Sequence, residues 1–184
     1  MAVEKLDLKA IWEQGKDWNA WLSICQGPQR EELERIYKEV PLSSADVAAM
    51  KALSRPVHVL ALAEDWCGDV RRNVPVLARL AAENPQMLRV RYTDKETKPA
   101  LMVRYLTNAA EAIPILVFFN DGFVEVGNWG PRPNECKRFM ARGKAAGKID
   151  EAREKIGAFY KADNHKSTIA EIRALIDIAS ATGA

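Results

Sequence analysis

The segment AEDWCGDVRRNVP, residues 63–75, joins a strand-like run to a helical pattern. The run before it, Pro56 to Leu62, is the most strand-like stretch of the first half of the chain. After Gly68, apolar side chains recur every three or four positions, as on one face of a helix. Cys67 therefore lies where a strand gives way to a helix. Unpaired backbone N–H groups and the positive end of the helix dipole favour a thiolate there, so the position suits a nucleophile.

The amino-acid sequence of this turn resembles the active site of the thioredoxin superfamily. Trp66, Cys67 and Gly68 stand together, Pro75 follows eight positions after the cysteine, and Ile113-Pro114 supplies the second half of the signature. More closely, the turn resembles a bacterial thioredoxin-like branch that reads Trp-Cys-Gly-Asp-Cys. Val70 stands where that branch has its second cysteine. The resemblance implies a thioredoxin-like α/β fold in which the Ile113–Pro114 peptide bond is cis and lies beside Cys67.

Composition and charge limit the class of protein. The 184 residues hold 27 Lys and Arg against 25 Asp and Glu, and 48% are hydrophobic. This length favours one domain with extensions. No basic tract is typical of nucleic-acid binding, no apolar run is long enough to span a bilayer, and the first residues lack a signal-peptide pattern. We expect a cytoplasmic protein that binds neither nucleic acid nor membranes. The sequence predicts no oligomeric state.

The pattern of elements divides the chain into three parts. Residues 1–55 form an N-terminal extension of three helices, and residues 147–184 form a C-terminal helical extension. Residues 56–146 alternate strand and helix in the order βαβ–α–ββα, which predicts a mixed sheet of about four strands. This is the element order of the thioredoxin core, and the resemblance covers about half of the chain. The expected strands are 57–63, 87–93, 113–119 and 123–126, and the expected helices of this part are 68–83, 96–106 and one beginning near Pro133.

Capping residues predict where several helices begin. Asp17 and the pair Ser43/Asp46 are expected to cap helices of the N-terminal extension. In the C-terminal extension, Asp150 is expected to cap one helix, and the pair Thr168/Glu171 is expected to form a capping box for the last one.

Cys67 is the expected catalytic residue. Arg71 and Arg72, one turn further on, favour its thiolate, whereas Asp65 and Asp69 oppose it, as does the neighbouring Glu64. In a dithiol mechanism the first cysteine attacks a disulfide and the second resolves the resulting mixed disulfide. Valine at position 70 cannot do this. We therefore expect monothiol exchange, in which glutathione or another thiol releases the mixed disulfide.

The remaining residues of the turn and the proline loop are expected to bind the partner. The resemblance assigns Ile113 the role of pairing with a substrate peptide beside Pro114, and Trp66 a place on the exposed binding face. The full set of expected binding residues is Trp66, Gly68, Asp69, Val70, Ile113 and Pro114. The simplest interpretation of Asp69 is a solvated turn residue, with selection of the partner as the alternative. The expected partners are protein or low-molecular-weight thiols and disulfides.

The other candidate groups have simpler interpretations. Cys25 and Cys136 each lie on an apolar helical stripe and are expected to be small core residues. Three cysteines and two histidines have no metal-site spacing, so we expect no metal and no cofactor other than a thiol co-substrate. A buried carboxylate usual in thioredoxins, six residues before the nucleophile, is replaced by Ala61.

Three other functions compete with monothiol exchange. A redox-inactive binding module that holds an extended peptide in a groove between Trp66 and Pro114 is the main alternative. A cluster-sharing monothiol glutaredoxin is weaker, because the turn does not match Cys-Gly-Phe-Ser. A glutathione transferase is disfavoured, since about 55 residues of helix precede the thioredoxin-like part.

Overall fold

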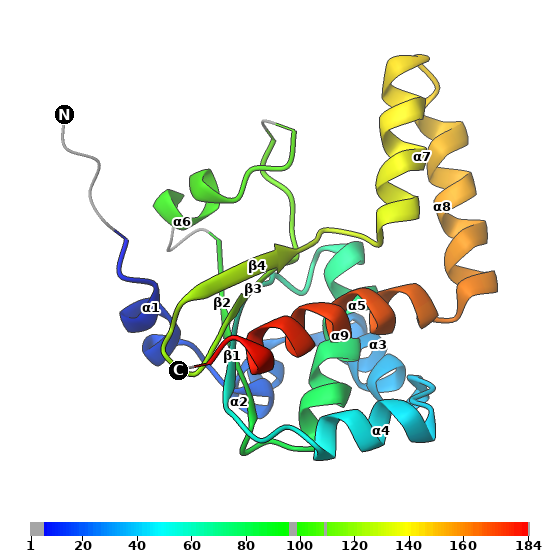
Figure 1. Ribbon diagram of the computed structural model, residues 1–184. Coiled ribbons are helices and arrows are strands. Elements are labelled where there is room, and N and C mark those ends of the chain that lie inside the picture. Colours follow the sequence, from blue (N-terminus) through cyan, green and yellow to red (C-terminus); the bar gives the residue numbers. More distant parts are fainter. Residues whose placement is uncertain (1–5, 96–98, 109, 184) are drawn as a thin grey trace, which may run out of the picture.

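A four-stranded mixed sheet forms the centre of the computed structural model, which describes residues 6–95, 99–108 and 110–183 (Figure 1). The strands are β1 (Val57–Leu62), β2 (Leu88–Thr93), β3 (Ile115–Phe119) and β4 (Glu125–Trp129). They lie in the order β2-β1-β3-β4. β1 and β2 are parallel, and the other two pairs are antiparallel. The predicted α/β fold with a mixed sheet is confirmed.

Helices account for most of the remaining chain. The described helices are α1 (Leu8–Gln14), α2 (Trp18–Ile24), α3 (Gly27–Glu39), α4 (Ser44–Lys51), α5 (Gly68–Ala82), α6 (Pro99–Arg104), α7 (Asn134–Ala145), α8 (Ile149–Asp163) and α9 (Lys166–Ala181). The expected helix at 96–106 thus begins at Pro99, and its first three residues lie outside the described part. No described helix has both the length and the apolar character needed to cross a membrane.

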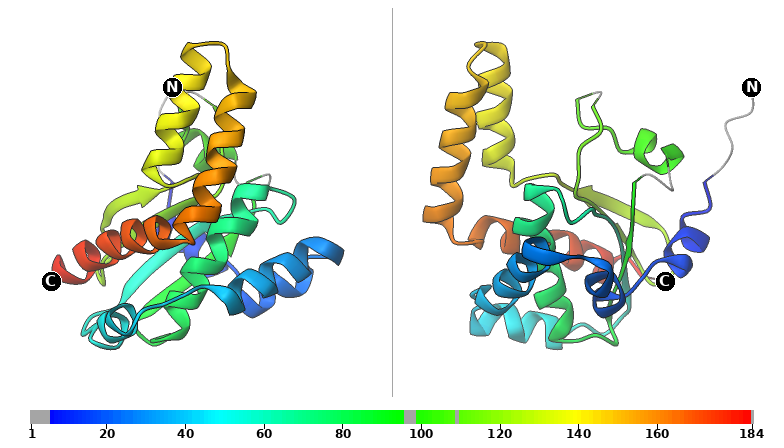
Figure 2. Two further views of the ribbon diagram at one scale, coloured as in Figure 1. Left: turned by 90° about the vertical axis from the view of Figure 1, so that its right-hand side faces the viewer. Right: turned by 180° about the vertical axis from the view of Figure 1, so that it is seen from behind.

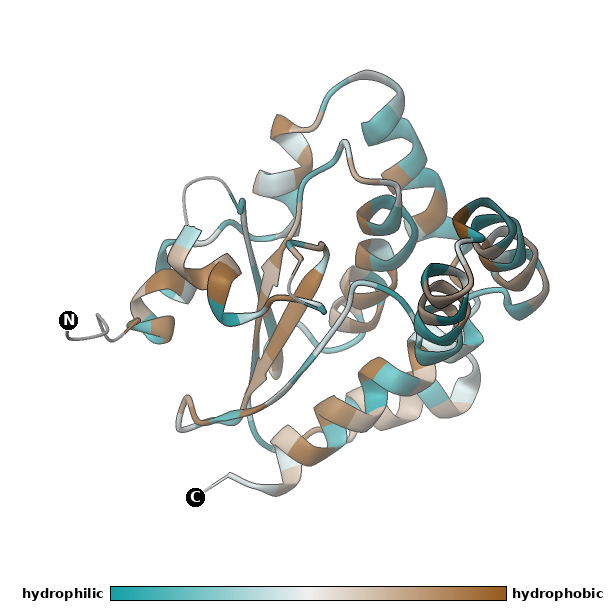
Figure 3. Ribbon diagram, turned by 90° about the horizontal axis from the view of Figure 1, so that it is seen from above, coloured by the Kyte–Doolittle hydropathy of each residue, from teal (hydrophilic) through white to brown (hydrophobic). Residues whose placement is uncertain are grey.

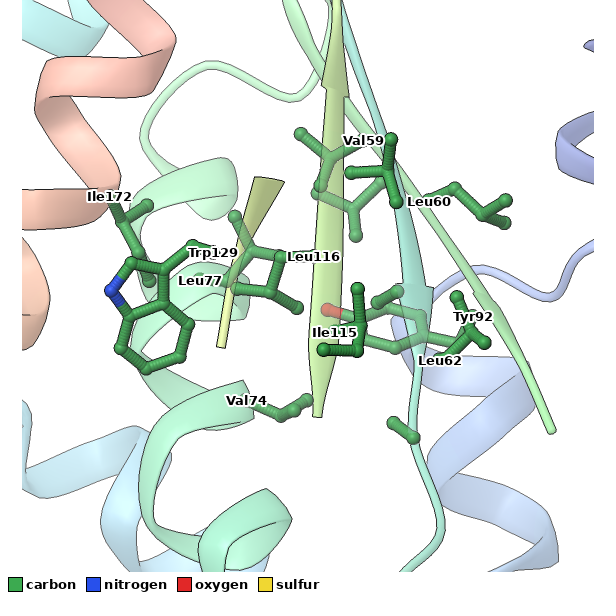
Figure 4. Packing of buried hydrophobic residues seen from close by; sticks show 14 of the residues in the cluster. Val59, Leu60, Leu62, Val74, Leu77, Tyr92, Ile115, Leu116, Trp129 and Ile172 are labelled. Atoms are coloured by element: carbon green, nitrogen blue, oxygen red, sulfur yellow. The ribbon is translucent and has the colours of Figure 1, made fainter. Parts of the chain in front are cut away.

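The burial patterns of the two parallel strands, β1 and β2, follow from their sequences. Every residue of β1 is buried, as expected for a short apolar run covered on both faces. β2 lies at an edge and alternates between buried and more exposed residues, because successive side chains of a strand point to opposite faces. Hydrophobic residues accordingly concentrate on the strands at the centre of the molecule (Figure 3). Figure 4 shows Leu116 of β3 beside Leu77 of α5 among the buried side chains, whereas Leu60 of β1 lies on the other side of the strands.

The N-terminal helices surround α5 and the β2 edge. α3 and α4 pack on α5, whereas α1 and α2 contact β2. The Asp17 cap and the Ser43/Asp46 capping box are confirmed. α1 was not predicted, because one buried residue, Trp12, gives a seven-residue helix no periodicity. Its indole Nε1 donates a hydrogen bond to the Val59 carbonyl oxygen at 3.0 Å.

The C-terminal helices divide into a hairpin and a closing helix. α7 and α8 lie side by side and project away from the sheet (Figures 1 and 2). α9 packs on β4, β3, β1 and α5, so the last helix covers the sheet beside α5. The predicted Asp150 cap is wrong, since α8 begins at Ile149 after Lys148. The predicted Thr168/Glu171 capping box is also wrong, because α9 begins at Lys166 and both side chains bond to other elements.

β4 begins later than its sequence suggested. The predicted strand at 123–126 is displaced to Glu125–Trp129. Asn120 extends the turn, since its carbonyl oxygen accepts from the Phe123 N–H and its side-chain oxygen from the Val124 N–H. Phe123 takes a positive φ of 60°, which is incompatible with a strand.

Candidate functional site

Cys67 lies at the junction of β1 and α5. It is the N-cap residue of α5, and its side chain accepts no bond from the first turn of the helix. The helix N-terminus therefore offers backbone N–H groups that no capping side chain satisfies. Cys67 is half-buried, and its thiol donates to the Ile113 carbonyl oxygen with an Sγ–O distance of 3.4 Å. The cysteine and Ile113-Pro114, 46 residues apart in sequence, are thus neighbours.

The proline loop is tightly enclosed. Ile113 and Pro114 are buried, and the peptide bond between them is cis. Gly130, just after β4, packs against the Pro114 carbonyl oxygen and has a φ of 135°. Any side chain at Gly130 would collide with that oxygen, so glycine is required by both space and backbone conformation.

Position 70 is part of the hydrophobic core. Val70 is fully buried on the first turn of α5, three residues after Cys67. Cys25 and Cys136 are also buried and unpaired. Burial and the nearby Asp65 carboxylate raise the pKa of Cys25 to about 11, and burial raises the pKa of Cys136 to about 12. Both thiols are therefore protonated near neutral pH, and Cys67 is the accessible cysteine of the described residues.

Asp69 is held in a salt bridge and is not the solvated residue that its sequence suggested. Its Oδ2 lies 2.5 Å from Nη2 of Arg132, in the segment that joins β4 to α7. The side chain of Arg132 is 26% exposed to solvent and that of Asp69 is 12% exposed. The charge of Asp69 is thereby neutralised beside the active turn, and its position is fixed.

Arg71 stabilises the turn rather than providing an unpaired positive charge. Its Nη1 donates to the carbonyl oxygens of Asp65 and Trp66 at 2.9 and 2.8 Å, and its Nε lies 2.5 Å from Glu32 on α3. The positive charge of Arg71 is therefore balanced by the Glu32 carboxylate. Arg72 instead places its guanidinium over the ring of Tyr160, 5.3 Å from the centroid.

A buried asparagine links α5 to the C-terminal helices. Asn73 is fully buried, and its Nδ2 donates to the Asp69 carbonyl oxygen at 2.9 Å and to the Tyr160 hydroxyl at 3.0 Å. Its Oδ1 accepts from the Thr168 hydroxyl at 3.0 Å. Sequence reasoning missed this residue, although a polar side chain on the apolar face of α5 was a signal that could have found it.

The outer rim of the turn is aromatic and charged. Trp66 is 54% exposed, and the Lys95 ammonium lies 5.8 Å from the centroid of its ring. Lys95 also pairs with Glu111, and its backbone N–H donates to Glu64. Sequence reasoning missed Lys95, because it precedes α6 and lies far from the turn along the chain.

Two cavities, of about 580 and 280 Å³, lie away from the turn, at the β2 edge and in the α7–α8 hairpin. A third, of about 220 Å³, is lined by residues around Cys25 and by Ala63, Glu64 and Asp65 at the start of the turn, but by neither Trp66 nor Pro114. The groove expected between Trp66 and Pro114 remains a prediction. Within the described residues, no cluster of His, Cys, Asp and Glu is arranged to hold a metal ion.

Comparison with known proteins supports the family and the fold. A family model described as thioredoxin matches residues 15–153. A crystal structure of a protein of unknown function from Pseudomonas aeruginosa aligns with a TM-score of 0.72 at 19% identity. An HIV epitope-scaffold aligns with a TM-score of 0.70, also at 19% identity. Both alignments cover 95% of this chain and 99% of the other. No curated protein matches the chain.

Proposed function

This chain belongs to the thioredoxin family, and we propose that it carries out thiol–disulfide exchange through a mixed disulfide at Cys67. The observation that supports this most directly is the position of the Cys67 thiol. Cys67 is the N-cap residue of α5, and its thiol is partly accessible to solvent and lies 3.4 Å from the carbonyl oxygen that precedes Pro114. A helix N-terminus stabilises negative charge, which favours the thiolate that attacks disulfides.

The proposed reaction has two steps. In the first, the Cys67 thiolate attacks one sulfur of a disulfide, forms a new S–S bond to it and releases the other sulfur as a thiolate. In the second, an external thiolate attacks the substrate sulfur of the mixed disulfide, which regenerates the Cys67 thiolate and leaves a new disulfide. The substrate disulfide is the oxidant and the external thiol, glutathione or another small thiol, is the reductant.

The first step cannot be followed by internal resolution at position 70. We propose that this chain derives from the Trp-Cys-Gly-Asp-Cys branch, with Val70 in place of the second cysteine. The high pKa values of Cys25 and Cys136 argue against their resolving the mixed disulfide, since few of these thiols ionise near neutral pH. A cytoplasmic location would supply the reducing thiols that the second step needs.

The partner-binding residues are proposed on the same grounds. Trp66 offers an exposed ring, and Ile113 with Pro114 lies against the thiol. Gly68 leaves space above the helix start, because a methyl group added there would meet only the end of the Arg71 side chain within 4 Å. Asp69 and Val70 act indirectly in this proposal, by fixing the first turn of α5.

A redox-inactive binding module is the second candidate. The exposure of Trp66 favours it, because tryptophan is enriched at protein–protein interfaces relative to the rest of the surface. The loss of a resolving thiol is compatible with both functions. The two are separated by the reactivity of Cys67.

The test is the rate of alkylation of Cys67 in the folded protein as a function of pH, read by mass spectrometry of peptides. Oxidised glutathione is added in a parallel reaction. Cys25 and Cys136 serve as buried controls in the same chain, and Cys67→Ser is the matched variant. Monothiol exchange predicts rapid alkylation at neutral pH and a glutathione adduct confined to Cys67 and released by dithiothreitol. Slow alkylation at all three cysteines with no adduct would contradict it and leave the binding module.

A further inference from the structure

The outer edge of β2 is paired at one end. The Tyr92 backbone exchanges two hydrogen bonds with Lys16, at 2.9 and 2.7 Å, so its N–H and C=O point away from β1. Backbone groups of a strand point alternately to its two sides, and therefore those of Val90 also point outward. Among the described residues, no acceptor bonds the Val90 N–H, while its carbonyl oxygen receives only a 3.4 Å contact from Arg91 Nη1.

A cavity of about 580 Å³ lies along this edge and extends over both faces of the strand. Trp12 forms one wall, and the Arg91 guanidinium lies over its ring at 5.1 Å. Trp18 and Tyr37 form the other wall, with their rings stacked at 5.6 Å. Since Arg91 and Val90 project to opposite faces of β2, these walls lie on opposite sides of the sheet. The cavity between these walls therefore lies in line with the sheet, next to β2, where an added strand would run.

We propose that this edge binds an extended acidic segment of a partner protein, which adds a strand to the sheet at Val90. Strand addition supplies main-chain hydrogen bonds to an unpaired edge and side-chain contacts at alternate positions. The short pairing with Lys16 already shows that the edge accepts an antiparallel neighbour. The partner strand would lie along the same edge, opposite Val90, where this protein's own chain leaves the edge of the sheet to form α2.

The side chains around the edge specify the sequence of the partner. Arg89 and Arg91 project to the same face, and neither forms an ion pair among the described residues. Residues opposite them on an added strand would face that side too, where carboxylates would pair with the guanidinium groups. The residue opposite Val90 would face Trp18 on the apolar side. The pattern is therefore acidic, apolar, acidic.

Other charges at the site are consistent with this choice. Asp17 also lines the cavity, but its carboxylate caps α2 by accepting from the Ala20 N–H at 2.8 Å. A second copy of β2 is disfavoured as the occupant, because its own Arg89 and Arg91 would oppose the same two cations.

The test uses a synthetic peptide, acetylated and amidated, of sequence Glu-Val-Glu-Val-Glu. Titration is followed by calorimetry and by tryptophan fluorescence, since Trp12 and Trp18 line the cavity. We expect binding with a dissociation constant below about 1 mM that weakens as salt is raised. The double variant Arg89→Ala/Arg91→Ala should bind at least about tenfold more weakly. The matched control is Arg138→Ala/Arg153→Ala, which removes two exposed arginines of the α7–α8 hairpin and should bind normally.

A second peptide tests the backbone pairing without altering the protein. Methylation of both valine nitrogens removes the N–H group that would donate to the Val90 carbonyl oxygen, whichever valine lies opposite Val90, and should weaken binding at least about tenfold. Absence of binding by the first peptide, equal binding by the methylated one, or equal binding by Lys-Val-Lys-Val-Lys would each overturn the proposal. A dimer seen by sedimentation at the concentrations of the titration, together with no binding of the first peptide, would also overturn it, in favour of a second copy at this edge.

Discussion

Replacing Asn73 with alanine should cost this protein a large part of its stability. The side chain lies fully buried on α5 and joins this helix to two other helices through its amide. It donates to the Tyr160 hydroxyl of α8, accepts from the Thr168 hydroxyl of α9, and donates to the Asp69 carbonyl oxygen on its own helix. Alanine would leave the Tyr160 and Thr168 hydroxyls in the interior without this partner.

The magnitude follows from these contacts. Each net hydrogen bond contributes about 1 kcal/mol, and a buried polar group left unsatisfied costs about 1–3 kcal/mol. Three bonds lie between 2.9 and 3.0 Å, which gives a loss of about 3 kcal/mol in the free energy of unfolding. The higher helix propensity of alanine offsets about 0.5 kcal/mol of this. In a chain of this size, the melting temperature should fall by about 5–12 °C.

The assay is urea unfolding followed by circular dichroism. Asn128→Ala, at an exposed position of β4, is the matched control and should change stability by no more than about 0.5 kcal/mol. Thr168→Val removes one hydroxyl with little change of shape, and the double variant with Asn73→Ala should show a coupling of about 1 kcal/mol. If Asn73→Ala behaves like Asn128→Ala, or if the two changes are strictly additive, the network does not stabilise the fold as argued.

Three further predictions concern the site, the pH dependence and the loop after β4. Val70→Cys, three residues after Cys67, should form an intramolecular disulfide on oxidation, because helical positions i and i+3 are within bridging distance. The variant should also gain dithiol turnover with a model disulfide. A variant that retains all its free thiols after oxidation would contradict this. Burial lowers the pKa of His58, so its contribution to stability is complete above about pH 6.5 and falls as the pH drops below that value. His58→Gln should therefore flatten the fall in urea midpoint between about pH 7 and pH 5, and an unchanged slope would refute the assignment. Gly130→Ala should lose more than about 3 kcal/mol, because the added methyl meets the proline carbonyl oxygen, whereas Gly157→Ala in α8 has open space and should be neutral or stabilising in the same unfolding assay.

Sequence reasoning succeeded where a feature depends on neighbouring residues. The buried run of β1, the apolar face of α5 and the position of Cys67 between them are local patterns, and all were predicted. The Asp17 cap and the Ser43/Asp46 capping box were predicted for the same reason, since each bond spans three residues.

Sequence reasoning failed where a polar side chain could bond either to a residue close in sequence or to a distant one, and the structure has the bond to the distant residue. Thr168 has the spacing of a capping residue, yet its hydroxyl bonds to Asn73, 95 residues earlier. Arg71 pairs with Glu32, 39 residues away, and Asp69 pairs with Arg132, which follows β4 much later in the chain. A local sequence pattern does not identify which residue from a distant part of the chain will lie next to a given side chain in the fold. The electrostatics of the active turn therefore had to be read from the structure.

The α7–α8 hairpin gives protein engineers a place to extend the molecule. Its turn contains Gly147, whose φ of 68° suits glycine and whose surroundings are open within 4 Å. The two helices pack mainly on each other and project from the sheet, so residues added at this turn would enter solvent rather than the core (Figure 2). A fluorescent or affinity module spliced in after Gly147 would be carried at a distance from Cys67 and from the β2 edge. Both sites would then be open to measurement in one reporter-bearing chain.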